Sequence, residues 1–150
     1  ADAIAEVGRG HRKTDLMDGA RYPTDYELGD GSKANLALLA ALIRLCDELD
    51  MASDRNPDLL YDTETMEGMS EKDLFEFFKH EAIHTLKFSE DNIVVIADTD
   101  KPDIADGVVA AIRTVKETLE YCLFVLGKRS EIQIDCKTIK LILNDKEIEV

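Results

Sequence analysis

The chain has 150 residues, of which 45% are hydrophobic, and a formal net charge of −14 at pH 7. The length corresponds to one domain, or to one domain with a small appendage, and the hydrophobic fraction is that of an ordinary globular protein. The acidic balance argues against nucleic acid and anionic membranes as partners, and no apolar run approaches the roughly 18 residues of a transmembrane helix.

The cysteines and the first residues of the chain indicate the cellular compartment in which the protein works. Cys46, Cys122 and Cys136 all lie in apolar segments. An odd count without paired spacing favours buried free thiols in a reducing environment. The first residues also lack the order of basic, apolar and small-residue regions that a signal peptide has. We therefore expect a cytoplasmic protein.

The chain opens with a short helical pattern and a basic cluster. Residues 2–9 predict the end of a helix that is too short to stand alone, which is typical of a fragment that opens in mid-helix. Arg9, His11, Arg12 and Lys13 follow as a basic cluster. Such a cluster can hold an anion, and His11, with an ordinary pKa of about 6.5, can protonate a leaving oxygen. The alternative is a solvated basic turn. Residues 13–32 predict a long polar loop.

A central helix is predicted from Leu36 to about Met51, with Ser32 as its N-cap. Its apolar residues lie nearly all round the helix, which is typical of a buried one; they are Leu36, Leu38, Leu39, Leu42, Ile43, Leu45 and Leu49. At helical spacing Asp47 and Asp50 continue the stripe that Leu36 begins. A buried carboxylate needs a partner, such as an arginine, a helix N-terminus or a metal ion. Alternatively, Asp47 pairs with Arg44 or Arg55, or is exposed.

The phrase Arg44-Leu45-Cys46-Asp47-Glu48-Leu49-Asp50 resembles the HD superfamily of metal-dependent phosphohydrolases, whose last metal-binding Asp lies late in an apolar helix. The resemblance implies that Asp47 binds a divalent metal ion (Mn, Mg, Zn or Fe), which would activate water against a phosphoester. His11 would be catalytic, and Arg12, Lys13 and Arg55 would hold the phosphate. The substrate would be a nucleotide or another phosphate-containing small molecule.

Two departures from the family pattern limit this hypothesis. The family carries a His-Asp doublet preceded by another His, whereas none of the three His residues here is followed by Asp. Where members of the family frequently have a His-His pair, this chain has His11-Arg12. Either the other ligands lie upstream of residue 1, which the opening in mid-helix favours, or the site is degenerate; in both cases we expect little catalysis by this chain alone. Some HD-type domains precede a heat-shock-protein-90-like ATPase. The second hypothesis is therefore a non-catalytic module coupled to an ATPase domain or partner chain, and an oligomer is possible.

The second half predicts an α+β arrangement. A helix is expected from Glu71 to about Phe88, capped by Ser70 with Asp73. The further expected elements are a strand at 93–97, a helix at 103–126 ending before Gly127, a strand around Ile132 and Ile134, and a hairpin of 139–143 with 148–150 around Asn144-Asp145. The fold class is thus α+β, with a mainly helical HD-like part at residues 1–90 and a small strand–helix–strand–hairpin subdomain at 91–150.

Two metal motifs remain. His80-Glu81-Ala82-Ile83-His84 spells HExxH on the expected helix, where both His residues could share a zinc ion with Glu117 or Glu120 as a third ligand. A zinc peptidase is therefore a weaker hypothesis; the alternative places both His residues at the polar edge of an amphipathic helix. Asp98, Asp100 and Asp103 lack the Gly and Glu of an EF-hand, which favours a solvated acidic turn.

Overall fold

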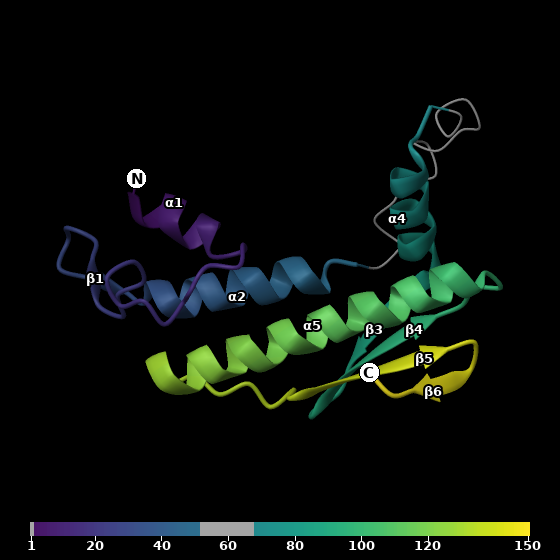
Figure 1. Ribbon diagram of the computed structural model, residues 1–150. Coiled ribbons are helices and arrows are strands. Elements are labelled where there is room, and N and C mark those ends of the chain that lie inside the picture. Colours follow the sequence, from purple (N-terminus) through teal and green to yellow (C-terminus); the bar gives the residue numbers. More distant parts are fainter. Residues whose placement is uncertain (1, 52–67) are drawn as a thin grey trace. The chain divides into compact units, whose positions relative to one another are not determined.

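The computed structural model describes residues 2–51 and 68–150 (Figure 1). It confirms the predicted α+β class. The chain divides into two units. Unit 1 comprises the described residues of Ala1–Asp50 and of Glu117–Lys137, and unit 2 comprises those of Met51–Lys116 and of Thr138–Val150. The long helix α5 (Pro102–Arg129) contributes its first part to unit 2 and its last part to unit 1.

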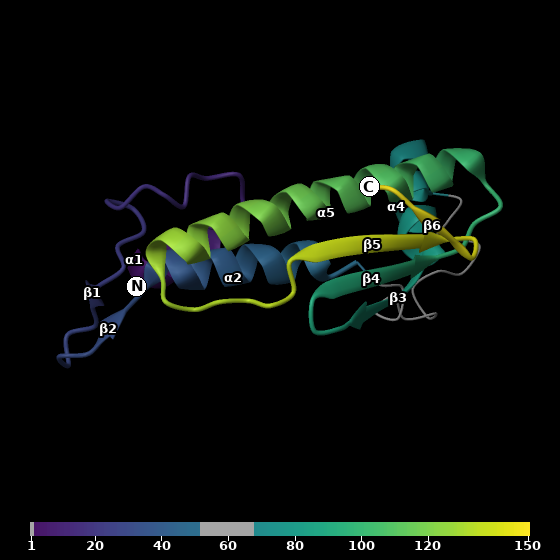
Figure 2. The ribbon, with the colours of Figure 1, turned by 90° about the horizontal axis from the view of Figure 1, so that it is seen from below.

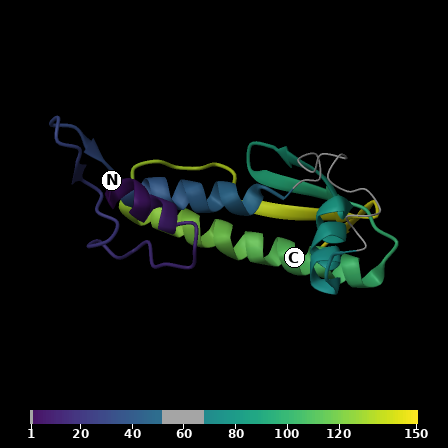
Figure 3. The same cartoon turned by 90° about the horizontal axis from the view of Figure 1, so that it is seen from above.

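Unit 1 is built around the central helix. It contains α1 (Asp2–Arg9), α2 (Leu36–Leu49), the last part of α5, and a small antiparallel pair of β1 (Tyr26–Glu27) with β2 (Lys33–Ala34). Helix α1 lies beside α2 (Figure 3).

Helix α2 is buried on one side only. Leu36, Ala37, Ala40, Ala41 and Leu45 are buried, whereas Leu39 and Ile43 are 41% and 42% exposed. The prediction of burial all round the helix is therefore wrong. The N-cap is Asn35 rather than Ser32, because residues 33–34 pair with β1 and the helix begins only after them. The Asn35 side chain accepts the Leu38 N–H at 2.9 Å and donates to the Arg129 carbonyl at 2.7 Å.

The polar loop before α2 is anchored to the end of α5. Leu16 and Tyr22 are both fully buried. The Leu16 N–H donates to the Tyr121 hydroxyl at 2.9 Å, and Arg129 donates to the Leu16 carbonyl at 3.0 Å. Two buried side chains and two long-range hydrogen bonds thus hold a segment whose composition predicts only a loop.

Unit 2 contains a four-stranded sheet in the order β3-β4-β5-β6 (Figure 2). The strands are β3 (Ile83–Phe88), β4 (Asn92–Ala97), β5 (Thr138–Leu143) and β6 (Lys146–Ile148). The outer pairs are antiparallel, and the central β4–β5 pair is parallel, which requires a crossover; α5 lies between these strands in the chain. The predicted strand at 93–97 is confirmed. The predicted hairpin forms around Asn144-Asp145, but its second strand is Lys146–Ile148 and not 148–150, because Lys146 already pairs with Leu143.

Buried side chains alternate with less buried ones along strands β4 and β5 of unit 2. Val95 and Leu141 face each other across β4 and β5, and both are fully buried. The first part of α5 adds a buried stripe at helical spacing; its members are Ile104, Val108, Ile112 and Val115. None of the described helices combines the length and apolarity that a membrane crossing needs.

Two predicted helix ends and one predicted strand are wrong. Helix α4 (Glu71–Ala82) ends six residues before Phe88, because Ile83 adopts an extended backbone and pairs with Ala97. Helix α5 continues through Gly127 to Arg129, and no strand forms around Ile132 and Ile134. The predicted cap of α4 is confirmed, since the Asp73 N–H donates to the Ser70 hydroxyl at 3.2 Å.

Candidate functional site

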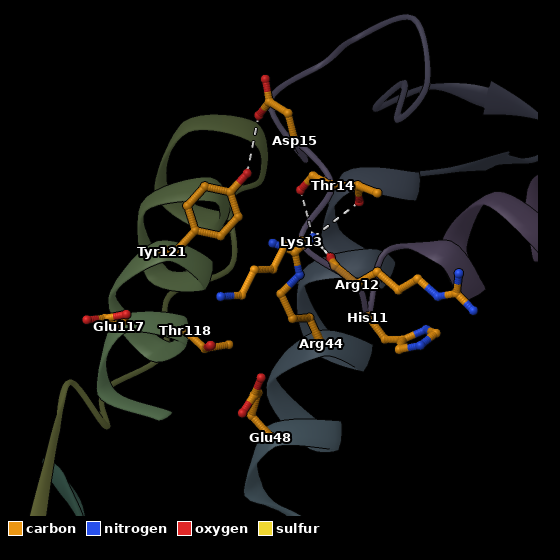
Figure 4. Close-up of a pocket in the computed structure, with 10 residues that line it drawn as sticks. All are labelled: His11, Arg12, Lys13, Thr14, Asp15, Arg44, Glu48, Glu117, Thr118 and Tyr121. Carbon is orange, nitrogen blue, oxygen red and sulfur yellow. Dashed lines mark hydrogen bonds between the residues drawn. The ribbon is translucent and has the colours of Figure 1, made fainter. Parts of the chain in front are cut away.

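A cavity in unit 1 collects the basic cluster that follows α1 (Figure 4). It is an open pocket of about 470 Å³, and the turn at residues 11–15, α2 and the last part of α5 line it. The lining residues are His11, Arg12, Lys13, Thr14, Asp15, Arg44, Glu48, Glu117, Thr118 and Tyr121.

Gly10 lets the turn approach α2 closely. It is buried, and a Cβ atom at this position would lie 2.5 Å from the Ala40 Cβ and 2.9 Å from the Val7 carbonyl oxygen. These distances are too short for any side chain, and backbone atoms cannot easily move aside. Only glycine therefore allows the chain to touch α2 here and to place residues 11–15 along the cavity.

Arg44 holds the turn from the other side. Its Nε donates to the Gly10 carbonyl at 2.6 Å, and Nη2 donates to the carbonyls of Arg12 and of Thr14, the latter at 2.7 Å. The guanidinium lies 5.2 Å from the centre of the Tyr121 ring, and the residue is only 7% exposed. None of these partners is a carboxylate. Carbonyl dipoles and a ring face solvate the cation without cancelling its charge, so a positive charge remains at the cavity.

The structure places the side chains of the predicted basic cluster on two sides of the cavity. Figure 4 shows the Lys13 side chain reaching toward α5, whereas His11 and Arg12 extend on the opposite side of Arg44. All three side chains are exposed at the rim. The Nδ1–H of His11 donates to the Gly8 carbonyl, which leaves Nε2 available to solvent or to a ligand. The cavity therefore offers an ammonium group on one side and an imidazole with a guanidinium on the other.

Acidic side chains line the same cavity. The pKa of Glu48 is raised, first by burial and then by the neighbouring Asp47 carboxylate, while Lys13 and Arg44 oppose the shift. The Tyr121 hydroxyl donates to Asp15 at 3.2 Å. Glu48 thus takes up a proton more readily than an ordinary glutamate, and an anion bound nearby would strengthen this tendency.

Asp47 does not lie where the sequence pattern places it. The buried line of α2 continues through Arg44 toward half-buried Glu48, whereas Asp47 is exposed and is not among the cavity residues. Arg44, a predicted alternative partner of Asp47, instead donates hydrogen bonds to backbone carbonyls. Within residues 2–51 and 68–150, no three His, Cys, Asp or Glu side chains lie close enough to hold a metal ion. The metal at Asp47 stays a prediction, and Arg55 lies outside the described residues.

The HExxH motif does not form a helical metal site. Helix α4 ends at Ala82, so His84 belongs to strand β3 and the two His residues are not one turn apart on a helix. The His80 Nδ1 lies 3.3 Å from the Met51 carbonyl oxygen, and the His84 Nε2 lies 3.4 Å from Asp98. The prediction that both His residues lie on one helix is therefore wrong, and the described residues do not show the helical HExxH geometry of a zinc peptidase.

Arg44, Thr118 and Tyr121 were not predicted as site residues. A single basic residue inside an apolar helix was the available signal for Arg44, since a buried cation requires acceptors. Thr118 and Tyr121 follow the turn by about a hundred positions and carry no local signal. Only the folded chain brings them to the cavity.

Comparison with known proteins gives one result. The model of the HD-CE family, an HD-related domain family, matches residues 1–123. No curated protein and no solved structure matches the chain.

Proposed function

This chain belongs to the HD-CE family, and we propose that its cavity beside Arg44 binds a phosphate-containing small molecule as part of an HD-type phosphohydrolase site. The observation that carries the proposal is the buried Arg44 guanidinium with its carbonyl partners. Because this cation folds the turn around itself, Lys13 and Arg12 are held at the rim of the cavity, beside a guanidinium that donates none of its described hydrogen bonds to a carboxylate, although Asp15, Glu48 and Glu117 also line the cavity. Phosphate is the common ligand of such an arrangement.

The residues suggest a division of roles in phosphoester hydrolysis. Water adds to phosphorus and releases a proton to the solvent, the bond from phosphorus to the leaving oxygen breaks, and that oxygen takes a proton. Lys13 and Arg12 would balance the charge of the phosphate oxygens. His11 in its imidazolium form would donate the proton from Nε2, because its Nδ1–H already bonds to Gly8.

The predicted metal ion is a separate question. Among the described residues, Asp47 is a single exposed carboxylate without the companion ligands that a divalent ion needs. The described residues therefore do not fit a metal centre by themselves. Lys13, Arg12 and His11 are given charge balance and proton donation, and the activation of the attacking water is assigned to none of them. We expect this chain to bind phosphate compounds and to hydrolyse them no faster than the uncatalysed reaction.

The test is calorimetric titration of pyrophosphate into the wild-type chain and into single variants. Removing one charge-assisted contact costs about 1.5 to 3 kcal/mol, so Lys13→Ala should weaken binding by roughly ten-fold or more. Lys128→Ala is the matched control, since it removes the same charge from an exposed position in the last turn of α5. It should change affinity less than two-fold.

Two results would refute the proposal. The first is an absence of pyrophosphate binding to the wild-type chain at millimolar concentration. The second is an equal loss of affinity in Lys13→Ala and Lys128→Ala, because this would show that pyrophosphate responds to total charge and not to the cavity.

A further inference from the structure

The exposed side of α2 carries a second feature, unrelated to the cavity. Leu39, Leu42, Cys46 and Leu49 recur at spacings of three, four and three residues, the spacing of a coiled-coil seam. Leu39 is 41% exposed, Cys46 is exposed, and Leu42 and Leu49 are half-buried. We define these four residues, with the adjoining Ile43, as the α2 seam.

The α2 seam differs from the other side of the same helix. On that side Ala37, Ala40 and Ala41 are fully buried. These buried alanines form the packing contact of α2 within unit 1, and the α2 seam lies outside that contact. Leu39 and Ile43 are large apolar side chains left in water, with half-buried Leu42 and Leu49 beside them at coiled-coil spacing; such a row is typical of a surface that receives another helix.

Charge decides which helix fits. Asp47 is exposed beside the seam and makes no ion pair with a described residue. The only basic residue of α2 is Arg44, which is buried on the opposite side. A docked helix would remove Asp47 from water, which is unfavourable unless the partner supplies a cation. A second copy would bring no basic residue of α2 and would add another net charge of −14.

We propose that the α2 seam binds an amphipathic helix of another protein, with leucine-like residues at its a and d positions and lysine or arginine beside them. The apolar seam provides the contact area, and Asp47 selects a basic partner over an acidic one. This proposal does not depend on phosphate binding, since Leu39, Ile43 and Asp47 do not line the cavity.

The probe is a synthetic 18-residue helical peptide with Leu at a and d and Lys at the flanking positions, and a second peptide in which Glu replaces each Lys. Binding is followed by fluorescence anisotropy in the presence of EDTA, so that no metal ion bridges the surfaces. The double variant Leu39→Ser/Ile43→Ser should weaken binding of the Lys peptide at least ten-fold. Ile4→Ser, at an 81% exposed residue of α1, is the matched control and should leave it unchanged. Circular dichroism verifies that each variant is folded.

The charge test uses Asp47→Lys. This variant should lose affinity for the Lys peptide and gain affinity for the Glu peptide. A surface that binds both peptides through nonspecific apolar contacts would not show this exchange. The proposal is overturned if the wild-type chain does not bind the Lys peptide, or binds both peptides equally. It is also overturned if sedimentation shows a dimer of the chain that Leu39→Ser/Ile43→Ser dissociates, because the seam would then serve a second copy.

Discussion

The Nε of Arg44 donates to the carbonyl of Gly10 at 2.6 Å, across 34 positions of sequence. This bond joins the one basic residue of α2 to the one position where the turn has no side chain. The two features require each other, because the turn can reach the guanidinium only where a glycine allows close approach to Ala40. The cavity therefore depends on a packing contact and a hydrogen-bond cluster that act on the same short segment.

Removing the guanidinium should be costly for folding. Arg44→Met leaves the carbonyls of Gly10 and Thr14 without their donor, which should lower the free energy of unfolding by about 2 to 4 kcal/mol. Urea denaturation measures the change. Arg21→Met is the control, since Arg21 pairs with Glu6 at an exposed site and its loss should barely move the midpoint. Equal effects of the two changes would contradict the organising role of Arg44.

A side chain at Gly10 should be poorly tolerated. Gly10→Ala places a Cβ within 2.5 Å of the Ala40 Cβ, and we expect a loss of about 1 to 3 kcal/mol of stability from the forced backbone shift. Gly8→Ala is the matched control, because nothing lies within 4 Å of its Cβ and the residue is in α1. It should be neutral or slightly stabilising. Thermal unfolding of both variants makes the comparison, and a milder effect at Gly10 than at Gly8 would be inconsistent with close contact.

The pKa of Glu48 should report on its neighbours. Asp47→Asn removes a negative charge that raises this pKa, so the pKa should fall; Lys13→Gln removes a positive charge that lowers it, so the pKa should rise further. Carboxyl-carbon NMR titration follows the group directly. Saturating pyrophosphate should shift the Glu48 pKa upward if phosphate binds in the cavity. A shift in the opposite direction would place the anion elsewhere.

The cysteines should differ in reactivity. Burial raises the pKa of the Cys122 thiol from its ordinary 9.0 to about 11, whereas Cys46 is exposed. An aromatic disulfide reagent at pH 8 should therefore modify Cys46 rapidly and Cys122 only on unfolding. Because the folded pKa is the higher one, the contribution of Cys122 to stability is complete below about pH 9 and is lost as the pH rises toward 11. The stability difference between wild type and Cys122→Ala should shrink over that range.

The hairpin turn offers a stabilising change. Asn144 and Asp145 both have positive φ, 50° and 62°, as a two-residue hairpin turn requires. Asp145→Gly should add about 0.5 to 1 kcal/mol of stability, since glycine adopts this backbone without strain. Asn144→Ala should be destabilising, because the Asn144 side chain also bonds to the N–H and the carbonyl of Thr99. Urea midpoints of the two variants should move in opposite directions.

Local chemistry in the sequence was sufficient for several elements. The run of β-branched residues at 93–97, the Asn144-Asp145 turn and the Ser70 cap each act over a few residues, and the structure confirms all three. The apolar run that begins at Leu36 identified α2. The phrase around Asp47 pointed to an HD-type domain, and the family match over residues 1–123 supports that coarser statement.

Only the tertiary structure decided the surroundings of each side chain. The helical pattern before Phe88 gave way to β3 because Ile83 finds a strand partner in Ala97. Periodicity could not reveal that α2 turns Arg44 inward and Asp47 outward, since its apolar residues lie on every side. That choice depends on Gly10, Thr14 and Tyr121, which contact Arg44 from positions some 30 to 77 residues away in sequence. Burial and solvation of a charge are set by such distant neighbours, and so the sequence determined most of the elements while the packed chain determined β3 and the site.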